Sequence, residues 1–258
     1  MNAISSSSST ALPAAAGSQR PDAIAVAAAT PRYTPYRFIH KGLRALMFST
    51  LQRAGALDAS LADDRAQIIE EVELLLATCA DHLAHENQFF HDALRQRAPR
   101  AVLPFHEDHL EHLDAIHALT RLLVDLRNAT DARAPALGYE LFLRLSIFVG
   151  ENLGHMAEEE SALTQALWEH FSDAEIAAME TALHATLTPQ EMGFCLRWRA
   201  QGMNASETTA VLAGAQPHMP AELFAQMAAT VQASMPAPRW AVVARALGLA
   251  PVAGLVNA

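Results

Sequence analysis

Four segments of this chain have apolar residues at the three- and four-residue spacing of an amphipathic helix. Proline or glycine marks most of the short connections between them. The segments span residues 36–54, 60–98, 105–128 and 136–171. Short connections force neighbouring helices to run antiparallel. The sequence therefore predicts an all-α fold, with an up-down-up-down four-helix bundle over residues 33–172.

The regions on either side of this bundle have a different character. Residues 1–32 are rich in serine, alanine and proline without apolar periodicity, so we expect a disordered N-terminal tail. Residues 173–258 contain helical patches that glycine and proline interrupt, and we expect a small C-terminal helical extension there. Ser172 and Glu175 have the spacing of a capping box at its first helix.

Composition excludes several functional classes. Apolar residues make up 51% of the chain, and 28 acidic residues outnumber 18 basic ones, for a net charge of -10. Because no basic run is present, we expect neither a nucleic acid nor an anionic membrane surface as partner. Cys79 and Cys195 form no zinc or disulfide pattern. No apolar run is long enough to span a membrane and no signal peptide is evident, so we expect a soluble, cytoplasmic protein.

Histidine is the unusual residue of this sequence. There are twelve in the chain, and most lie in one stretch: His40, His82, His85, His91, His106, His109, His112, His117 and His155. Within this stretch a pattern occurs twice: a single histidine on one helix, then His-x-x-x-Glu on the next. The two copies consist of His40 with His82 and Glu86, and of His109 with His155 and Glu159. Residues four apart lie on the same helical face, so each His-x-x-x-Glu pair can share one site.

All six of these side chains fall on the apolar faces of their helices. An unpaired buried imidazole or carboxylate costs several kcal/mol, so each group needs a partner. Metal ions satisfy the set most simply, with imidazoles as terminal ligands and two carboxylates bridging a pair of ions. A mixed nitrogen and oxygen set without thiolate suits iron or manganese and disfavours structural zinc.

These motifs resemble the hemerythrin-like (HHE cation-binding) domain over about residues 33–172. The matching stretches are HKGLR at 40–44, HLAHE at 82–86, EDH at 107–109 and HMAEE at 155–159. The resemblance implies a four-helix bundle holding a non-haem di-iron centre with bridging carboxylates and an oxo or hydroxo bridge. It also implies the roles of the six residues, with terminal ligands His40, His82, His109 and His155 and bridging ligands Glu86 and Glu159.

The sequence departs from the oxygen-carrying hemerythrins on the third helix. Those carriers have a His-x-x-x-His pair there, but Leu113 and Phe105 flank His109 at that spacing. His106 or His112 can supply a fifth histidine, and Glu160 offers a further carboxylate. The set of four histidines and two glutamates is closer to relatives linked to iron sensing, nitric oxide response or iron-centre repair. Reversible dioxygen carriage is therefore not expected.

The remaining residues of chemical interest have simpler interpretations. We expect His85, His91, His112 and His117 on solvated helix faces, with His85 and His106 the best alternative ligands or partners of ligands. Cys79 is expected to fill the core. A ferritin-like oxidase needs Glu-x-x-His motifs, which are missing, as are metalloprotease, phosphate-loop and nucleophile-elbow motifs. A metal-free bundle with paired His and Glu residues is the alternative for the six-residue set.

The sequence thus predicts a metal-binding or sensing protein rather than an enzyme. Its expected ligands are dioxygen, nitric oxide, peroxide or iron itself. One alternative makes the C-terminal extension a module that signals to a protein partner or mediates self-association. Another is a di-iron redox enzyme for peroxide turnover or iron-centre repair, although the sequence shows no dedicated acid, base or substrate pocket for it.

Overall fold

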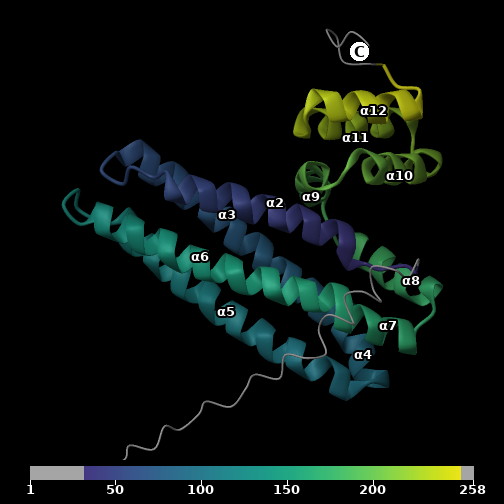
Figure 1. Ribbon diagram of the computed structural model, residues 1–258, viewed down its shortest axis with the longest axis horizontal. Coiled ribbons are helices and arrows are strands. Elements are labelled where there is room, and N and C mark those ends of the chain that lie inside the picture. The colour runs from purple at the N-terminus through teal and green to yellow at the C-terminus, as the bar shows by residue number, and fades with distance from the viewer. Residues whose placement is uncertain (1–31, 251–258) are drawn as a thin grey trace, which may run out of the picture.

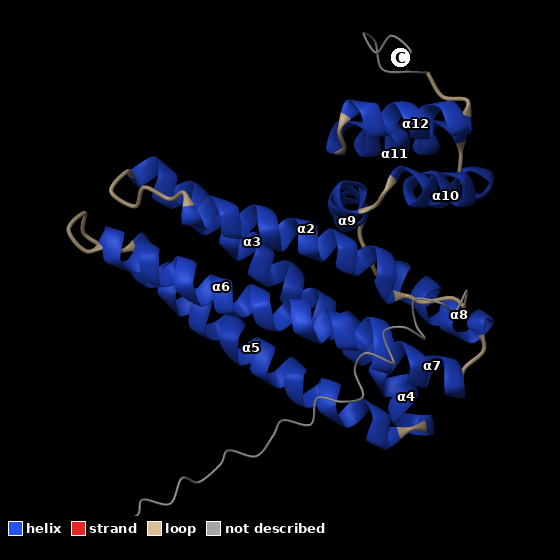
Figure 2. Ribbon diagram, viewed as in Figure 1, coloured by secondary structure: helices blue, strands red, loops and turns tan. Residues whose placement is uncertain are grey.

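The computed structural model describes residues 32–250 of the chain. Every regular element in this range is helical and no strand occurs in it (Figure 2), which confirms the predicted all-α class. The predicted tail, residues 1–32, lies outside the described residues except for Arg32. That residue donates hydrogen bonds to the carbonyl oxygens of Trp168 and Phe171 and to the Asp173 carboxylate.

Four long helices lie side by side in the first two thirds of the chain (Figure 1). They are α2 (Tyr36–Gly55), α3 (Ala62–Glu86), α5 (Pro99–Arg127) and α6 (Ala134–Glu158). Helix α2 packs on α3 and α6, and α5 packs on the same two helices. The connections 56–61 and 128–133 lie at the same end of the group, at the left of Figure 1. Successive long helices therefore run in opposite directions.

Two of these helices continue through a short π-helical turn into another α-helix. After α3 come the π-helix η1 (Asn87–His91) and α4 (Asp92–Arg97). After α6 come the π-helix η2 (Glu159–Leu163) and α7 (Thr164–His170). The two turns begin directly after Glu86 and at Glu159, so the duplication seen in the sequence extends to the backbone. π-turns inside α-helices frequently mark functional sites.

The start of α5 differs from the prediction. The helix was expected after Pro104, but it begins at Pro99, and Pro104 lies inside it. Pro99 occupies the first helical position, where a backbone N–H would have no partner within the helix, so proline loses no hydrogen bond there. Pro104 lies five residues further on, inside the helix, where its missing N–H removes the bond to the carbonyl oxygen of Arg100.

The apolar core is divided by a polar level. On one side, fully buried residues of three helices include Val72, Leu75, Leu123, Leu141 and Leu145. On the other side a separate apolar cluster forms from residues near the opposite helix ends: Tyr36, Leu94, Val102, Phe105, Leu163, Leu167, Phe171 and Ile176. The His and Glu residues of the duplicated pattern lie between these clusters on every helix. Apolar packing therefore encloses the candidate site from both ends.

The C-terminal helices follow as a separate group. They are α8 (Asp173–His184), α9 (Pro189–Gly202), α10 (Ala205–Ala215), α11 (Ala221–Ser234) and α12 (Ala237–Leu247). The predicted capping box of Ser172 and Glu175 is confirmed at the start of α8. Trp240 is buried among α9 to α12 in an apolar cluster of their own. Among residues 32–250, no helix combines the length and hydropathy that a membrane span requires.

Helix α9 docks closely on α2 through glycine (Figure 1). A Cβ atom at Gly202 would lie 2.2 Å from the carbonyl oxygen of Lys41, and one at Gly42 would lie 3.0 Å from the backbone nitrogen of Arg199. Both contacts involve backbone, which cannot move aside as a flexible side chain can. The two glycines therefore bring the C-terminal helices into direct contact with the helix that contains His40.

We predict that Gly202→Ala lowers the free energy of unfolding by about 1–3 kcal/mol, the usual cost of overpacking a tight contact. Gly214→Ala is the matched control, because a Cβ there meets no atom within 4 Å. In a helix interior that control change should be neutral or stabilising by up to about 1 kcal/mol. Chemical denaturation measures both variants. Equal stability of the two would contradict the close packing of α9 on α2.

Candidate metal centre

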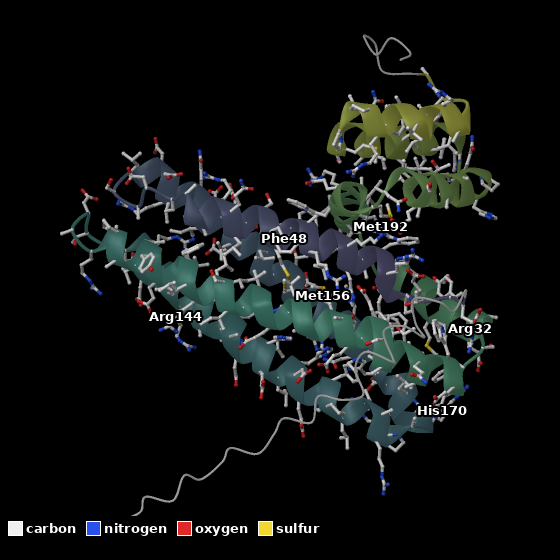
Figure 3. The ribbon with its side chains drawn as sticks, in the orientation of Figure 1. Arg32, Phe48, Arg144, Met156, His170 and Met192 are labelled. Carbon is white, nitrogen blue, oxygen red and sulfur yellow. The ribbon has the colours of Figure 1, made fainter. Side chains whose placement is uncertain are left out.

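The structure brings all six residues of the duplicated pattern together between the four long helices. His40 comes from α2, His82 and Glu86 from α3, and His109 from α5. His155 ends the α-helical part of α6 and Glu159 begins η2. Figure 3 labels Met156, the buried neighbour of His155, which marks the level of the cluster on α6. Five of the six side chains are buried, and His82 is the most exposed at 15%.

The first group of ligand atoms consists of His40, His82, Glu86 and Glu159, each with one atom within 4.8 Å of the others. The Nε2 atom of His82 lies 3.0 Å from Glu86 Oε1. The Nε2 atom of His40 lies 3.4 Å from the same oxygen and 3.5 Å from Glu159 Oε2. Two imidazoles thus face two carboxylates across a space the size of one ion.

The second group consists of His109, His155, Glu86 and Glu159, within the same limit of 4.8 Å. Oε1 of Glu159 lies 3.2 Å from His155 Nε2 and 3.5 Å from His109 Nε2. Oε2 of Glu86 lies 3.6 Å from His109 Nε2. Both glutamates therefore belong to both groups, and each presents one oxygen to either side, which is the arrangement of a carboxylate that bridges two cations.

The hydrogen bonding inside the cluster is incomplete in a way that fits metal ions. Nε2 of His109 and Nε2 of His155 lie 3.0 Å apart and face each other. Nε2 of His82, Oε2 of Glu86 and both carboxylate oxygens of Glu159 are buried without a hydrogen-bond partner among the described residues. Buried polar atoms are nearly always paired. Lone pairs that converge without donors are satisfied by cations, so the residues present fit a pair of metal ions.

The outer ring nitrogens are bound in the way that metal-ligating histidines require. Nδ1 of His40 donates to Glu160 at 3.0 Å, Nδ1 of His109 to Asn87 Oδ1 at 3.1 Å, and Nδ1 of His155 to Asp108 at 3.3 Å. Such bonds fix the tautomer that leaves the Nε2 lone pair free for a metal. Glu160 also accepts a bond from Arg44. It lies behind His40 and outside both ligand groups, so it orients a ligand in this structure.

His91 is the residue of the cluster that sequence reasoning missed. It was expected on a solvated face, but it is fully buried, and its ring stacks on His109 with centroids 4.6 Å apart. Its Nε2 lies 3.8 Å from Glu159 Oε1, and neither ring nitrogen has a hydrogen-bond partner among the described residues. The π-turn explains the error. An α-helical period places a residue five positions after Glu86 off the buried face, whereas i→i+5 bonding brings it beneath Glu86.

The other histidines that were considered for a fifth ligand lie outside both ligand groups. His112 was also expected in solvent, but it is buried against His155 with centroids 4.8 Å apart. Burial is the main reason that the pKa of His112 falls to about 4. His85 and His106 are half-buried, and His117 is exposed as predicted. The expectation of solvated faces is therefore wrong for His91 and His112.

Tyr36 adds a hydroxyl group to the edge of the cluster. Its ring stacks on His40 with centroids 5.2 Å apart, and its buried Oη has no hydrogen-bond partner among the described residues. Burial, together with the charges of Glu159 and Glu86, raises the pKa of Tyr36 well above its ordinary value. The phenol therefore stays protonated near neutral pH. Its O–H is a donor without an acceptor beside the first ligand group.

Electrostatics in the cluster keep the glutamates charged. Burial alone lowers the pKa of His40, but hydrogen bonds with Glu160 and Glu86 outweigh it and raise the value to about 9. Burial also opposes the charge on His155, where the attraction of Glu159 raises the pKa to about 9. Burial and Glu86 raise the pKa of Glu159, yet its histidine neighbours bring it to about 2. Without metal, protons on the imidazoles neutralise the two carboxylates.

Comparison with protein-family models, with curated proteins and with solved structures finds no match for this chain. The functional interpretation therefore depends on the geometry of the cluster and on the motifs that form it.

We predict that the metal-free protein loses stability as pH rises from about 7 to about 8.5. His40 and His155 have pKa values of about 9 in the folded chain against an ordinary 6.5, so their protonation stabilises the fold. This contribution is complete below pH 6.5 and is lost as pH rises through 9. The expected loss exceeds about 1 kcal/mol, since one pKa unit corresponds to ~1.4 kcal/mol.

Chemical denaturation at several pH values, with a chelator or with bound metal, measures this effect. His91 has a pKa of about 4, mainly because of burial, and His112 is likewise neutral, so neither contributes in this interval. Bound metal should reverse the slope, because ligation needs neutral imidazoles and strengthens as protons leave. A metal-free protein of constant stability over this interval would contradict the protonation states assigned here.

Proposed function

We propose that this chain is a hemerythrin-like protein that binds two non-haem irons. In this proposal the four long helices form an up-down-up-down four-helix bundle over residues 33–172, and residues 173–258 form a helical extension. The observation that supports it is the sharing of Glu86 and Glu159 between two groups of histidine ligands. The set contains nitrogen and oxygen ligands without thiolate, which favours iron or manganese over structural zinc.

In the proposed site, different side chains bridge the ions, bind them terminally and orient the terminal ligands. Glu86 and Glu159 would bridge the two ions. His40 and His82 would be the terminal ligands of one ion, and His109 and His155 those of the other. Glu160, Asn87 and Asp108 orient three of those imidazoles. The apolar clusters above and below enclose the centre along the length of the helices.

Six protein ligands leave coordination positions open on two octahedral ions, and the bound irons would supply these positions to dioxygen, nitric oxide or peroxide. Two unpaired groups flank the open space. The Tyr36 hydroxyl lies beside the first ligand group and can donate a hydrogen bond to a small ligand. The neutral His91 ring lies beside the second group. A binding or sensing role follows more directly from this arrangement than a catalytic one.

We predict about two irons per chain in protein produced with ample iron, as expected for a carboxylate-bridged site in a helix bundle. The His155→Ala variant should bind less iron. Iron should raise the melting temperature of the unaltered protein but not of this variant, because a metal stabilises only the folded state that binds it. Glu86→Gln should lose both irons, since its carboxylate serves both groups. Elemental analysis and thermal melts provide the two measurements.

His117→Ala is the matched control for these variants. His117 is exposed on α5, the same helix as His109, so this variant should keep its iron. Unchanged iron content in His155→Ala or Glu86→Gln would refute the ligand assignment. Zinc in place of iron would leave the cluster as a metal site but reject the di-iron function.

One observation favours a sensing role in which the C-terminal helices take part. Lys41, the neighbour of the candidate ligand His40, donates to both carboxylate oxygens of Glu207 on α10, at 2.6 and 2.7 Å. The backbone of α9 contacts the same part of α2 at Gly42 and Lys41. A shift of α2 on metal or gas binding would therefore reach α9 and α10 directly.

We predict that iron binding changes amide hydrogen exchange in α9 and α10 more than in α12, which packs on α10 rather than on α2. Exchange is compared between metal-free, iron-loaded and nitric oxide-treated protein by mass spectrometry. Lys41→Met should reduce the difference, because it removes the ion pair with Glu207. Identical protection of α9 and α10 in all three states would reject the sensing role while leaving the metal site intact.

A further inference from the structure

A large cavity lies between the metal-bearing helices and the C-terminal helices. Its volume is about 820 Å³, which is within the usual range for sites of small organic ligands. Residues of α2 and α3 form one wall, and residues of α8, α9 and α11 form the other. One part of the wall contains Tyr36, His82 and Glu86 of the candidate metal centre. The cavity therefore runs from the metal centre to the C-terminal helices.

The walls of this cavity are mostly apolar. They include Ile39 and Leu43 from α2 and Leu183, Phe194 and Met227 from the C-terminal helices. Three of the large apolar side chains that are most exposed in residues 32–250 also line it: Leu74 at 47%, Met192 at 43% and Leu223 at 52% (Figure 3 labels Met192). Apolar side chains around a concave space are typical of a site for an apolar molecule.

Arg199 provides the one strong cation of the cavity wall. Its Nε is buried, and no hydrogen bond or ion pair to its guanidinium group occurs among residues 32–250. Its only recorded ring contact within that range is with Phe38, at 5.9 Å from the ring centroid. Arg199 as a whole is half-buried, and leaving its buried Nε without a partner is costly. The guanidinium group has the donor geometry that binds a carboxylate with two parallel hydrogen bonds.

The acidic groups of the wall are accounted for without Arg199. Glu191 accepts hydrogen bonds from the backbone and side chain of Thr188 at the start of α9. Asp81 is exposed to solvent, and Glu86 belongs to the metal centre. Glu180 lies 3.8 Å from His184 and makes no ion pair with Arg199, although its charge attracts the guanidinium group at longer range. The described part of the chain therefore leaves the guanidinium group available to a ligand.

We propose that this cavity binds an elongated apolar carboxylate, with the acid group on Arg199 and the apolar body along the wall formed by α2, α3 and α11. The site needs no bound metal, so it goes beyond the di-iron proposal and does not depend on it. Because His82 and Tyr36 line the same cavity, the apolar body of the ligand would extend toward them. No sequence pattern indicates this cavity, because about a hundred positions in the chain separate its two walls.

Calorimetric titration of the full chain with dodecanoate tests the proposal, with iron content determined on the same sample. Dodecanol and dodecyltrimethylammonium serve as probes of the same length without the negative charge. We expect saturable binding of about one dodecanoate per chain, and binding of the other two at least about tenfold weaker, since a charge-assisted pair with arginine is lost.

Two variants locate the site. Arg199→Met should weaken dodecanoate at least about tenfold and leave dodecanol unchanged, whereas Arg197→Met, an exposed arginine on the same helix, should bind normally. Gly193→Phe should reduce the binding of dodecanoate and dodecanol alike, because Gly193 lines the cavity and a Cβ there meets no atom within 4 Å. Gly150→Phe on exposed α6 surface is its control, since it has equally free surroundings.

The outcomes separate clearly. Charge-selective binding that Arg199→Met and Gly193→Phe both weaken supports the proposal, whether or not the sample contains iron. Absence of saturable binding in the unaltered chain overturns it, as does equal affinity for dodecanoate in Arg199→Met. If Arg199→Met fails to fold, Gly193→Phe with its control still tests whether the ligand binds in this cavity. Dodecanol and dodecyltrimethylammonium then test whether the site requires a negative charge on the ligand. Concentration-dependent self-association without dodecanoate binding would assign the cavity to a second copy of the chain instead.

Discussion

Two glutamates and their facing histidines lie at one level between two apolar clusters, and the rest of the structure is arranged around this concentration of charge. Carboxylates without partners would destabilise such an interior by several kcal/mol each. Their oxygens face imidazole nitrogens whose opposite ring atoms are already bound by Glu160, Asn87 and Asp108. Cations or protons at the centre would balance this charge. The same groups that are costly without such a partner could therefore hold a metal ion.

The two π-turns help to bring the candidate metal ligands to one level. The turn η1 begins at Asn87, directly after Glu86, and the turn η2 begins at Glu159 itself. The residue five positions after the glutamate then falls beneath it. In the first copy this residue is His91, which stacks on His109. In the second copy it is Thr164, whose hydroxyl donates to the Glu159 carbonyl oxygen. The two halves are thus alike in backbone but differ in chemistry, with an extra imidazole on one side.

Local patterns predicted the parts of the structure that depend on helical periodicity. The four amphipathic segments, the capping box at Ser172 and the burial of Glu86, His155 and Glu159 all follow from spacing within one helix. His91 was misplaced because a π-turn changes that spacing, and no sequence period reports it. Pro104 was misread as a helix boundary because Pro99 already provided one. The cavity and the place of Arg199 in its wall could not be predicted from the sequence, since they depend on how α9 and α11 pack against α2 and α3.

We propose that Glu86 and Glu159 would hold two metal ions between them. A crystal structure of the iron-loaded protein, with anomalous scattering measured on both sides of the iron absorption edge, tests it most directly. We predict two iron peaks about 3.5–4 Å apart, as in other two-metal sites, with both carboxylates between them and His40 and His82 on one side. His109 and His155 should lie on the other side. A single peak, or iron bound elsewhere while the cluster keeps its histidines protonated, would contradict the account.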